Sequence, residues 1–295
     1  MIALFGPTGV GKTAVAIALA ERLRARGKDP VAVSADALQV YAGLEVLTGA
    51  ADAQERHRLE HRLVGVLPVT ETCSAGRYAA LAHAEIDDAL AAGRMPIVVG
   101  GTGLYLRAAL ADLDLRPPPD PAIRGALVER LALEGARVLH DDLTRRAPDT
   151  AAHIDPGDGR RVVRALELLE AGLPAAQARK GESQLWTAAT RHPTHLVALV
   201  MERGALYERI DARVEAMVAA GAEGEVRAAE AAGASATARK ALGYEHLLRG
   251  DVEAMKRDTR RYARRQITWL RKLPGVTTID VTGRSPEAVA AEIDR

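Results

Sequence analysis

The first residues of the chain place a glycine-rich loop between an apolar run and an Ala-rich helical stretch. Met1 to Phe5 have the character of a buried β-strand, and the next eight residues follow the spacing G-x-x-x-x-G-K-T. These residues are Gly6, Pro7, Thr8, Gly9, Val10, Gly11, Lys12 and Thr13. In such a loop the backbone amides converge on an anion at the positive end of the following helix, the lysine adds a charge, and the threonine hydroxyl can hold Mg2+. A chance glycine-rich turn is the alternative, but strand, loop and helix coincide here, so the motif predicts a site for a di- or triphosphate.

Further β-rich runs alternate with helical ones along the chain. They are Pro30 to Ala35, Pro96 to Val99, His195 to Met201 and Val276 to Val281. This alternation predicts βαβ units, and therefore an α/β fold with a P-loop NTPase-like core in which helices flank a parallel sheet. We expect residues 1–115 and 191–295 to form this core.

More than ninety residues separate the third and fourth of these strands, far more than one crossover connection needs. The Pro-rich run from Arg116 to Pro121 leads out of the core, and helical patterns follow near Ala122 to Glu134 and Gly157 to Glu170. We therefore interpret residues 116–190 as a mostly helical insertion domain.

Composition limits the classes of protein to which the chain can belong. Of its 295 residues 48% are hydrophobic, enough for a full core, and no apolar run is long enough to span a bilayer. Since there is also no basic leader, we expect a cytoplasmic protein without a membrane partner. Cys73 is the only cysteine, which excludes an internal disulfide and a Cys-rich zinc module. The formal net charge of +1 means that any nucleic-acid site must be a local patch.

Asp36 follows the second strand, at the edge of the sheet where open α/β folds bind their ligands. A carboxylate at that position can coordinate Mg2+, accept a proton or cap the next helix. The residues alone leave these three roles open.

The third strand ends in Gly100-Gly101-Thr102-Gly103, where a Walker B motif would place an Asp for Mg2+. The missing carboxylate argues against nucleotide hydrolysis. The turn instead supplies amides and a hydroxyl close to the phosphates, unless its glycines serve only a tight turn with positive φ.

His57, Glu60 and His61 match the H-x-x-E-H pattern of some zinc sites. Five residues are a weak signal, and nothing in the sequence identifies a third ligand. We therefore interpret the segment as a solvated, charged surface helix.

The segment from Lys256 to Lys272 carries eight basic residues, with Asp258 as its only acid. Projected at 100° per residue, most of the basic side chains fall within an arc of roughly 140°, and apolar and aromatic ones lie opposite. The basic set is Arg257, Arg260, Arg261, Arg264, Arg265, Arg271 and Lys272, and the opposite set is Tyr262, Ile267, Trp269, Leu270 and Leu273. A face of one charge sign repels itself, so it predicts a polyphosphate backbone as its partner, with a merely solvated face as the alternative.

Two further basic features are less distinctive. Arg160, Arg161 and Arg164 have helical spacing within the insertion and can either contact phosphates or pair with Glu167. Arg203 follows the fourth strand at the ligand edge of the sheet, where an arginine can reach a leaving phosphate.

Seven ordered blocks of the chain resemble the tRNA dimethylallyltransferases, the isopentenyl transferases that prenylate the adenine 3′ of the anticodon. The blocks are Gly6 to Thr13, Ser34 to Tyr41, Gly100 to Leu106, Asp155 to Glu167, Arg209 to Val226, Ala241 to Tyr244 and Thr259 to Arg271. The Gln-Val-Tyr, Gly-Gly-Thr-Gly-Leu-Tyr and Arg-Gln-x-Thr-Trp parts are typical of this family, whereas many kinases and ATPases share the phosphate loop.

The resemblance implies transfer of a dimethylallyl group from dimethylallyl diphosphate to the N6 amine of that adenine, with release of pyrophosphate. Lys12, Mg2+ bound by Thr13, and Arg203 would then stabilise charge on the leaving pyrophosphate. Asp36 would accept the proton of the amine, and Thr102 would contact both reacting groups. The adenine would have to flip out of the anticodon loop to enter the site.

The resemblance also implies that the anticodon stem-loop of tRNA binds to the core and to the insertion. Nothing in the sequence requires the enzyme to be more than a monomer. The residues expected to contact tRNA are Asp36, Ala37, Leu38, Gln39, Thr102, Arg124, Arg160, Arg161, Val162, Val163, Arg164, Arg257, Arg261, Arg264 and Arg265. Among them, Gln39 would help to hold the flipped base.

Two segments depart from the family pattern. Ala37 replaces the usual Ser after Asp36, and Glu45 to Ala51 replace the usual Asp-Ile-Gly-Thr-Ala-Lys-Pro. These changes bear on turnover and substrate preference more than on the class of reaction. Because of these changes, a non-catalytic RNA-binding relative remains an alternative. Because of the phosphate loop, a P-loop kinase that acts on a small molecule remains another.

Overall fold

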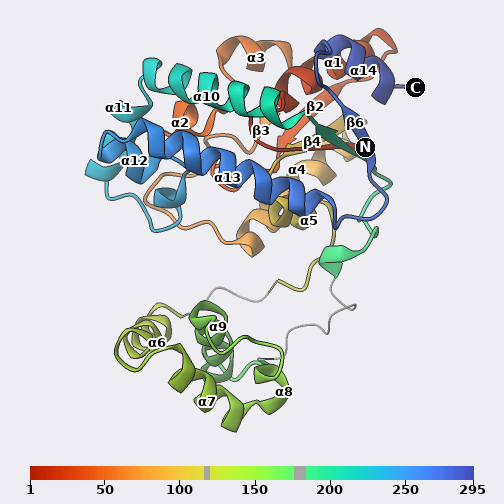
Figure 1. The fold of residues 1–295 in the computed structure, drawn as a ribbon. Helices are drawn as coiled ribbons and strands as arrows, with labels where there is room; N and C mark the ends of the chain where they lie inside the picture. The colour runs from red at the N-terminus through yellow and green to blue at the C-terminus, as the bar shows by residue number, and fades with distance from the viewer. Residues whose placement is uncertain (116–119, 176–183) are drawn as a thin grey trace. The chain divides into compact units, whose positions relative to one another are not determined.

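The computed structural model describes residues 1–115, 120–175 and 184–295 (Figure 1). The chain divides into two compact units, one formed by residues 1–114 with 184–295 and the other by residues 115–183. Residues 184–190, which the sequence analysis places in the insertion, therefore belong with the first unit. No helix in the described residues is both long and apolar enough to cross a membrane.

The first unit is built on a six-stranded sheet with the strand order β3-β2-β4-β1-β5-β6. All neighbouring strands are parallel. The strands are β1 (Ile2–Phe5), β2 (Pro30–Ser34), β3 (His61–Arg62), β4 (Met95–Gly100), β5 (His195–Val200) and β6 (Thr277–Asp280). The predicted parallel sheet is thus confirmed. The sequence does not predict β3, because a strand of two polar residues has no apolar run to mark it.

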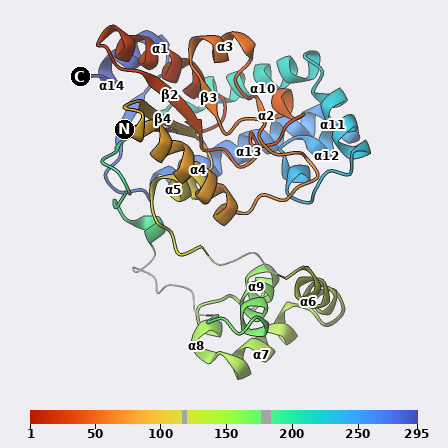
Figure 2. The ribbon, with the colours of Figure 1, turned by 180° about the vertical axis from the view of Figure 1, so that it is seen from behind.

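Helices cover both faces of this sheet. The helix α1 (Lys12–Ala25) packs against α14 (Pro286–Ile293), and α4 (Ala75–Ala91) packs against α5 (Gly103–Leu110) on the other face (Figure 2). β1 and β2 are buried along their whole length, as expected of strands that have helices on both sides.

The first unit contains further helical elements. They are α2 (Glu45–Thr48), α3 (Ala53–Arg58), η1 (Gln184–Trp186), α10 (Arg203–Ala219), α11 (Ala222–Ala231), η2 (Ala238–Lys240), α12 (Tyr244–Leu248) and α13 (Val252–Leu270). α13 packs on α10, α12 and α5, so a helix close to the end of the chain also contacts an element from much earlier in the sequence.

The second unit contains α6 (Pro121–Glu134), α7 (Ala136–Arg146), α8 (Pro148–Ala151) and α9 (Gly159–Glu170). Its core is apolar and includes Leu127, Leu139, Leu143, Ile154, Val162, Val163 and Leu166. The side chains of Val162 and Val163 are buried in this core, and the contact of these two residues with tRNA stays a prediction.

Charged side chains of the second unit are partly paired. The carboxylate of Glu167 is buried and forms ion pairs with Arg124 at 3.1 Å and Arg164 at 3.1 Å. Arg161 pairs with Asp158 at 3.3 Å. The pairing of Arg164 with Glu167 that the sequence analysis left open is therefore present, and it leaves Arg160 and Arg161 as the most exposed of the three arginines.

The H-x-x-E-H segment is not a metal site in the structure. His57 lies in the last turn of α3, Glu60 pairs with Arg62 and Arg94, and Nδ1 of His61 is 2.6 Å from the Leu59 carbonyl. No group of three potential metal ligands occurs in the part of the chain that the structure describes. Only half of the predicted surface helix forms, since His61 belongs to β3.

Candidate active site

The glycine-rich loop joins β1 to α1 as predicted. Gly9 and Gly11 have φ of 82° and 98°, in the left-handed region that favours glycine. A Cβ on Gly6 would lie 2.7 Å from the Leu199 carbonyl oxygen, so the loop also needs a glycine for close packing. Lys12 Nζ donates to the Gly6 and Pro7 carbonyls at 3.0 and 2.9 Å. The ammonium group therefore folds back over the loop, on the side where the amides converge.

The charge of Lys12 depends on its surroundings. Burial lowers the pKa of Lys12 to about 8, the carboxylate of Asp36 opposes this effect, and the guanidinium of Arg213 adds to it. A bound anion would favour the charged form and raise this pKa again. The three side chains thus influence one another across the mouth of the loop.

Asp36 lies just beyond β2, in a turn rather than before a helix. Its Oδ1 accepts a hydrogen bond from the Leu38 amide at 3.0 Å, which fixes the carboxylate locally. Because no helix begins at this turn, the helix-capping role left open by the sequence is excluded. The second carboxylate oxygen accepts no hydrogen bond from the described residues and is available to a proton or a cation.

The Gly100–Gly103 turn is shaped by close contacts rather than by positive φ. None of its glycines has positive φ, so the tight-turn explanation is wrong. A Cβ on Gly101 would collide with the side chain of Gln266, and one on Gly103 would collide with the ring of Trp269. The turn therefore needs glycine because α13 lies directly against it.

Thr102 lies between the two glycines that contact α13. Its hydroxyl is 3.1 Å from the hydroxyl of Tyr262. Burial raises the pKa of Tyr262 to about 12, and the charge of Asp36 contributes to the increase. Thr102, which follows β4, and Asp36, which follows β2, therefore both lie near Tyr262.

Gln266 joins the glycine-rich loop to the Gly100–Gly103 turn. The sequence analysis did not select this residue individually. Its Oε1 accepts from the Thr8 amide at 2.8 Å, and its Nε2 donates to the Gly101 carbonyl at 2.7 Å. The side chain is 4% exposed. The signal was its place inside the Arg-Gln-x-Thr-Trp block, on the core side of an amphipathic helix.

Two arginines of α10 approach the phosphate loop, and the sequence analysis selected neither. Arg213 Nη2 donates to the Gly49 carbonyl at 3.1 Å, and its Nε is buried without a hydrogen-bond partner in the described residues. Burial lowers the pKa of Arg213, and the charges of Asp36 and Glu55 oppose this. A Cβ on Gly11 would lie 3.3 Å from Arg209 Nη2. The spacing i, i+4 on α10 was the available signal.

Arg203, by contrast, lies in the first turn of α10, exposed to solvent. Its Nε donates to the Tyr207 hydroxyl at 3.2 Å, and its guanidinium lies over the Tyr207 ring. The predicted contact of Arg203 with the diphosphate stays a prediction, and Arg209 and Arg213 of the same helix also approach the loop.

The segment Glu45–Ala51 that departs from the family pattern is held in place by side chains from elsewhere. Gln39 Nε2 donates to the Gly49 carbonyl at 3.4 Å, and Gln39 Oε1 accepts from the Ser34 hydroxyl at 2.9 Å. Glu225 accepts from the Val46 and Leu47 amides at 2.9 and 2.8 Å, at the N-terminus of α2. The amide of Gln39 is thus already engaged with this segment.

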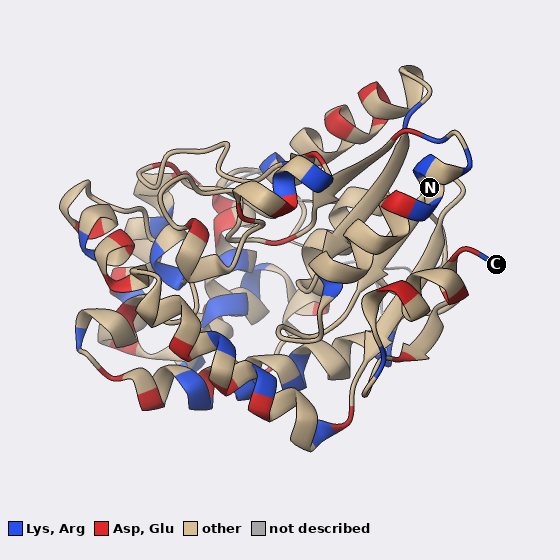
Figure 3. Cartoon of the chain, turned by 90° about the horizontal axis from the view of Figure 1, so that it is seen from above, with Lys and Arg blue, Asp and Glu red and all other residues tan. Residues whose placement is uncertain are grey.

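The basic face of α13 is less isolated than its own sequence suggests. Acidic residues of α10 pair with it, since Lys256 contacts Glu215 at 2.7 Å and Arg260 contacts Asp211 at 2.6 Å. Figure 3 shows basic and acidic residues interspersed along the helices. Of the predicted opposite face, Leu270 and Leu273 are buried, whereas Tyr262, Ile267 and Trp269 are half-buried.

Comparisons with known proteins agree with this arrangement. A family model described as IPP transferase matches residues 39–273. The chain is 42% identical over 288 residues to a tRNA dimethylallyltransferase of Thermobifida fusca, which covers 94% of this chain and 88% of that protein.

Solved structures are also similar. The full-length tRNA isopentenylpyrophosphate transferase of Bacillus halodurans superposes with a TM-score of 0.69 at 32% identity, over 99% of this chain and 93% of that one. A eukaryotic dimethylallyltransferase, described as acting on tRNA, gives a TM-score of 0.76 at 25% identity, over 96% of this chain and 74% of that one.

Proposed function

The chain belongs to the tRNA dimethylallyltransferase family, and we propose that it transfers a dimethylallyl group from dimethylallyl diphosphate to the N6 amine of the adenine 3′ of the anticodon. One observation carries this proposal. The carboxylate of Asp36 after β2 and the ammonium of Lys12 after β1 interact electrostatically, while the end of β4, the strand between them, carries Gly101 and Thr102 instead of a Walker B Asp. The site thus combines a diphosphate cradle with a base, and lacks the carboxylate that phosphoryl transfer uses.

The diphosphate would be held by cations on two sides of the glycine-rich loop. Lys12 lies within the loop, and Arg209 and Arg213 approach it from α10. The buried Nε of Arg213, which lacks a hydrogen-bond partner in the described residues, is a donor suited to a diphosphate oxygen. Charge that develops on the leaving pyrophosphate would therefore meet donors that are already in place.

Mg2+ is compatible with the oxygen donors at this edge of the sheet. The Thr13 hydroxyl makes no hydrogen bond to the described residues and can face a cation. A cation that keeps several waters and takes its other ligands from substrate phosphates needs no more protein ligands than this one. When bound, Mg2+ would neutralise part of the diphosphate charge.

The reaction itself would form one N–C bond, break one C–O bond and move one proton. The N6–C bond forms at the allylic carbon, the C–O bond to the diphosphate breaks, and its electron pair leaves on the pyrophosphate oxygen. The N6 proton passes to Asp36, whose orientation is set by the Leu38 amide. Thr102 and Tyr262 line the approach of the base, which must be flipped out of the anticodon loop.

For the anticodon stem-loop, we propose contacts on both units. Arg257, Arg261, Arg264 and Arg265 are exposed on α13, and Arg160 and Arg161 are exposed on α9. Side chains of this kind bind phosphates and position the RNA without reading its sequence. The second unit, residues 115–183, would then act as the tRNA-binding insertion.

Incubation of the purified protein with unmodified tRNA and either labelled dimethylallyl diphosphate or labelled ATP tests the proposal. Label that enters tRNA only from the allylic donor supports it. Phosphoryl transfer from ATP to a small molecule would indicate a kinase, and tight tRNA binding without transfer would indicate a non-catalytic relative.

A further inference from the structure

The segment Glu45–Ala51 lies directly against α10 at Gly49, the residue that ends α2. Gly49 has a φ of 56°, in the left-handed region that favours glycine. A Cβ on Gly49 would overlap the guanidinium of Arg213 and would lie 2.7 Å from Cε of Met217. The Gly49 carbonyl accepts a hydrogen bond from Arg213 Nη2 at 3.1 Å. Because Gly49 has no side chain, it leaves free the space that the Arg213 guanidinium occupies.

Gly49 is also a residue at which this segment departs from the usual Asp-Ile-Gly-Thr-Ala-Lys-Pro. Aligned residue by residue, Leu47 stands in place of the glycine and Gly49 in place of the alanine. Leu47 is buried, so the side chain present at the first position is packed. The side chain absent at the second position makes room for Arg213. The glycine of the segment is therefore at the position that touches α10.

A contact from another helix fixes the segment in place. Glu225 of α11 accepts hydrogen bonds from the Val46 and Leu47 amides at 2.9 and 2.8 Å. α2 has no capping side chain of its own, so Glu225 supplies the cap from outside. A methyl group added at Gly49 would therefore displace the end of the flexible Arg213 side chain rather than the backbone of the segment.

The bond to Gly49 leaves part of the Arg213 guanidinium available. Its Nε is buried and has no hydrogen-bond partner in the described residues. A buried donor without a partner is costly, and phosphate oxygens match the fork of guanidinium donors. Arg213 interacts electrostatically with Lys12 of the phosphate loop and with Asp36. The Gly49 carbonyl thus fixes one nitrogen of the group, while another remains for an anion at the loop.

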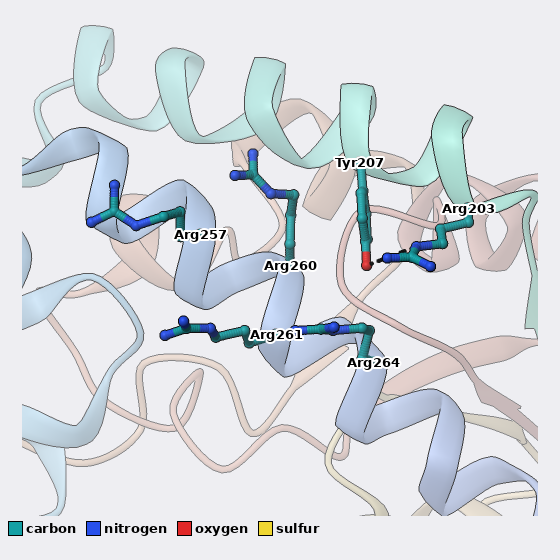
Figure 4. Close-up of a pocket in the computed structure, with 6 residues that line it drawn as sticks. All are labelled: Arg203, Tyr207, Arg257, Arg260, Arg261 and Arg264. Atoms are coloured by element: carbon teal, nitrogen blue, oxygen red, sulfur yellow. Dashed lines mark hydrogen bonds between the residues drawn. The ribbon is translucent and has the colours of Figure 1, made fainter.

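This side of α10 differs from the side that packs on α13. Arg203 and Tyr207 lie where α10 faces the arginines of α13 (Figure 4). Arg209 and Arg213 lie about 120° around the helix from them. A change at Gly49 therefore bears on the diphosphate contacts and not on the basic face of α13.

We propose that Gly49 is a positioning residue for Arg213, because its carbonyl and its lack of a side chain together direct the guanidinium toward the diphosphate. This proposal rests on the proposed function, since it takes the ligand of the phosphate loop to be a diphosphate. It gives a role to one departure from the family pattern. The segment Glu45–Ala51 sets the affinity for the diphosphate through Arg213.

The test is a double-mutant cycle of Gly49→Ala and Arg213→Ala. Pyrophosphate binding is measured by calorimetry, and binding of unmodified tRNA by fluorescence anisotropy. Gly43→Ala is the matched control, because Gly43 lies just before the same segment, is exposed and has a φ of 83°. A Cβ on Gly43 would meet nothing within 4 Å. An alanine there is strained in the same region of φ but does not disturb Arg213.

We expect Gly49→Ala to weaken pyrophosphate binding about tenfold, as the loss of one hydrogen bond to a charged group would, and to leave tRNA affinity within about twofold. In the Arg213→Ala protein, Gly49→Ala should cause no further loss beyond about twofold, because no guanidinium is left to displace. Gly43→Ala should behave as wild type. Unchanged pyrophosphate affinity in Gly49→Ala, or additive losses in the double variant, would overturn the proposal. Equal weakening of pyrophosphate and tRNA binding would also overturn it, because Gly49 would then support the whole site.

These binding readouts need no turnover, so they separate the proposal from the proposed function. A wild-type protein that binds pyrophosphate but transfers no prenyl group would refute the proposed function, and the cycle would still decide whether Gly49 acts through Arg213. A wild-type protein that binds no pyrophosphate would refute both. Where transfer occurs, Gly49→Ala should raise the KM for dimethylallyl diphosphate about tenfold and leave the KM for tRNA unchanged.

Discussion

Replacement of Gln266 by Leu should loosen α13 from the active site at a cost that can be worked from the structure. The change keeps most of the side-chain volume and removes both hydrogen bonds, to the Thr8 amide and to the Gly101 carbonyl. Gln266 is 4% exposed, so water does not easily replace them. Each lost hydrogen bond, which leaves a buried backbone group unpaired, should cost about 1–2 kcal/mol. The free energy of unfolding should therefore fall by about 2–4 kcal/mol.

Gln266→Glu tests the direction of each bond. A carboxylate still accepts from the Thr8 amide, but it places an oxygen against the Gly101 carbonyl, so its pKa should rise above the value of about 4.3 for free Glu. The protonated carboxyl can donate to Gly101 as the amide does. Because the folded pKa is the higher one, this stabilisation is present below about pH 4.3 and is lost as the pH rises through the folded pKa.

Urea unfolding, followed by the fluorescence of Trp186 and Trp269, measures these changes in stability. Steady-state assays measure the KM for dimethylallyl diphosphate. This KM should increase, because the phosphate loop loses the hydrogen bond that supports it. Thr268→Ala is the control on the same helix. Thr268 is exposed and bonds only within α13, so its loss should change stability by no more than about 0.5 kcal/mol. A Leu variant with wild-type stability and wild-type KM would refute the idea that Gln266 joins the two loops.

Three further predictions concern the reacting groups. Asp36→Asn should reduce prenyl transfer by roughly 10²–10⁴-fold with little change in tRNA affinity, and single-turnover assays with near wild-type rates would remove Asp36 as the base. Since the pKa of Lys12 is about 8 without ligand, the contribution of Lys12 to pyrophosphate affinity should be present below that pH and be lost above it, with proton uptake by Lys12 on binding. Calorimetry in buffers of different ionisation enthalpy measures this uptake, and the same uptake in the Lys12→Ala protein would contradict it. Arg213→Ala should raise the KM for dimethylallyl diphosphate more than the KM for tRNA, whereas Arg227→Ala on the exposed side of α11 should change neither. Equal effects on both substrates would show that Arg213 supports the fold rather than the diphosphate.

The phosphate loop, the parallel sheet and the place of Asp36 could be predicted because each depends on neighbours in the sequence. Gly9 and Gly11 sit at the positive φ that the motif requires. Each of the five predicted strands begins and ends within one residue of its observed bounds, and continuous apolar runs mark those, such as β1 and β2, that are covered on both faces. Asp36 follows from them, because the carboxyl ends of parallel strands share one edge.

The partners of α13 could not be predicted, because they come from elements distant in the chain. Counted alone, its basic face has Asp258 as the only acid, yet Asp211 and Glu215 of α10 neutralise part of it. Likewise, the approach of Arg209 and Arg213 to the phosphate loop depends on how α10 packs.

By itself, therefore, the sequence determined the chemistry that each short segment can perform: an anion cradle, a carboxylate at a strand end, and a helix with one basic face. The tertiary structure alone decided which segments act together. Gln266 bonds to two loops that lie more than 160 residues away from it in the chain, and Arg260 meets Asp211 only where α13 and α10 pack. The physical reason is that the geometry of a loop or helix depends on adjacent residues, whereas contacts between helices depend on how all their side chains pack at once.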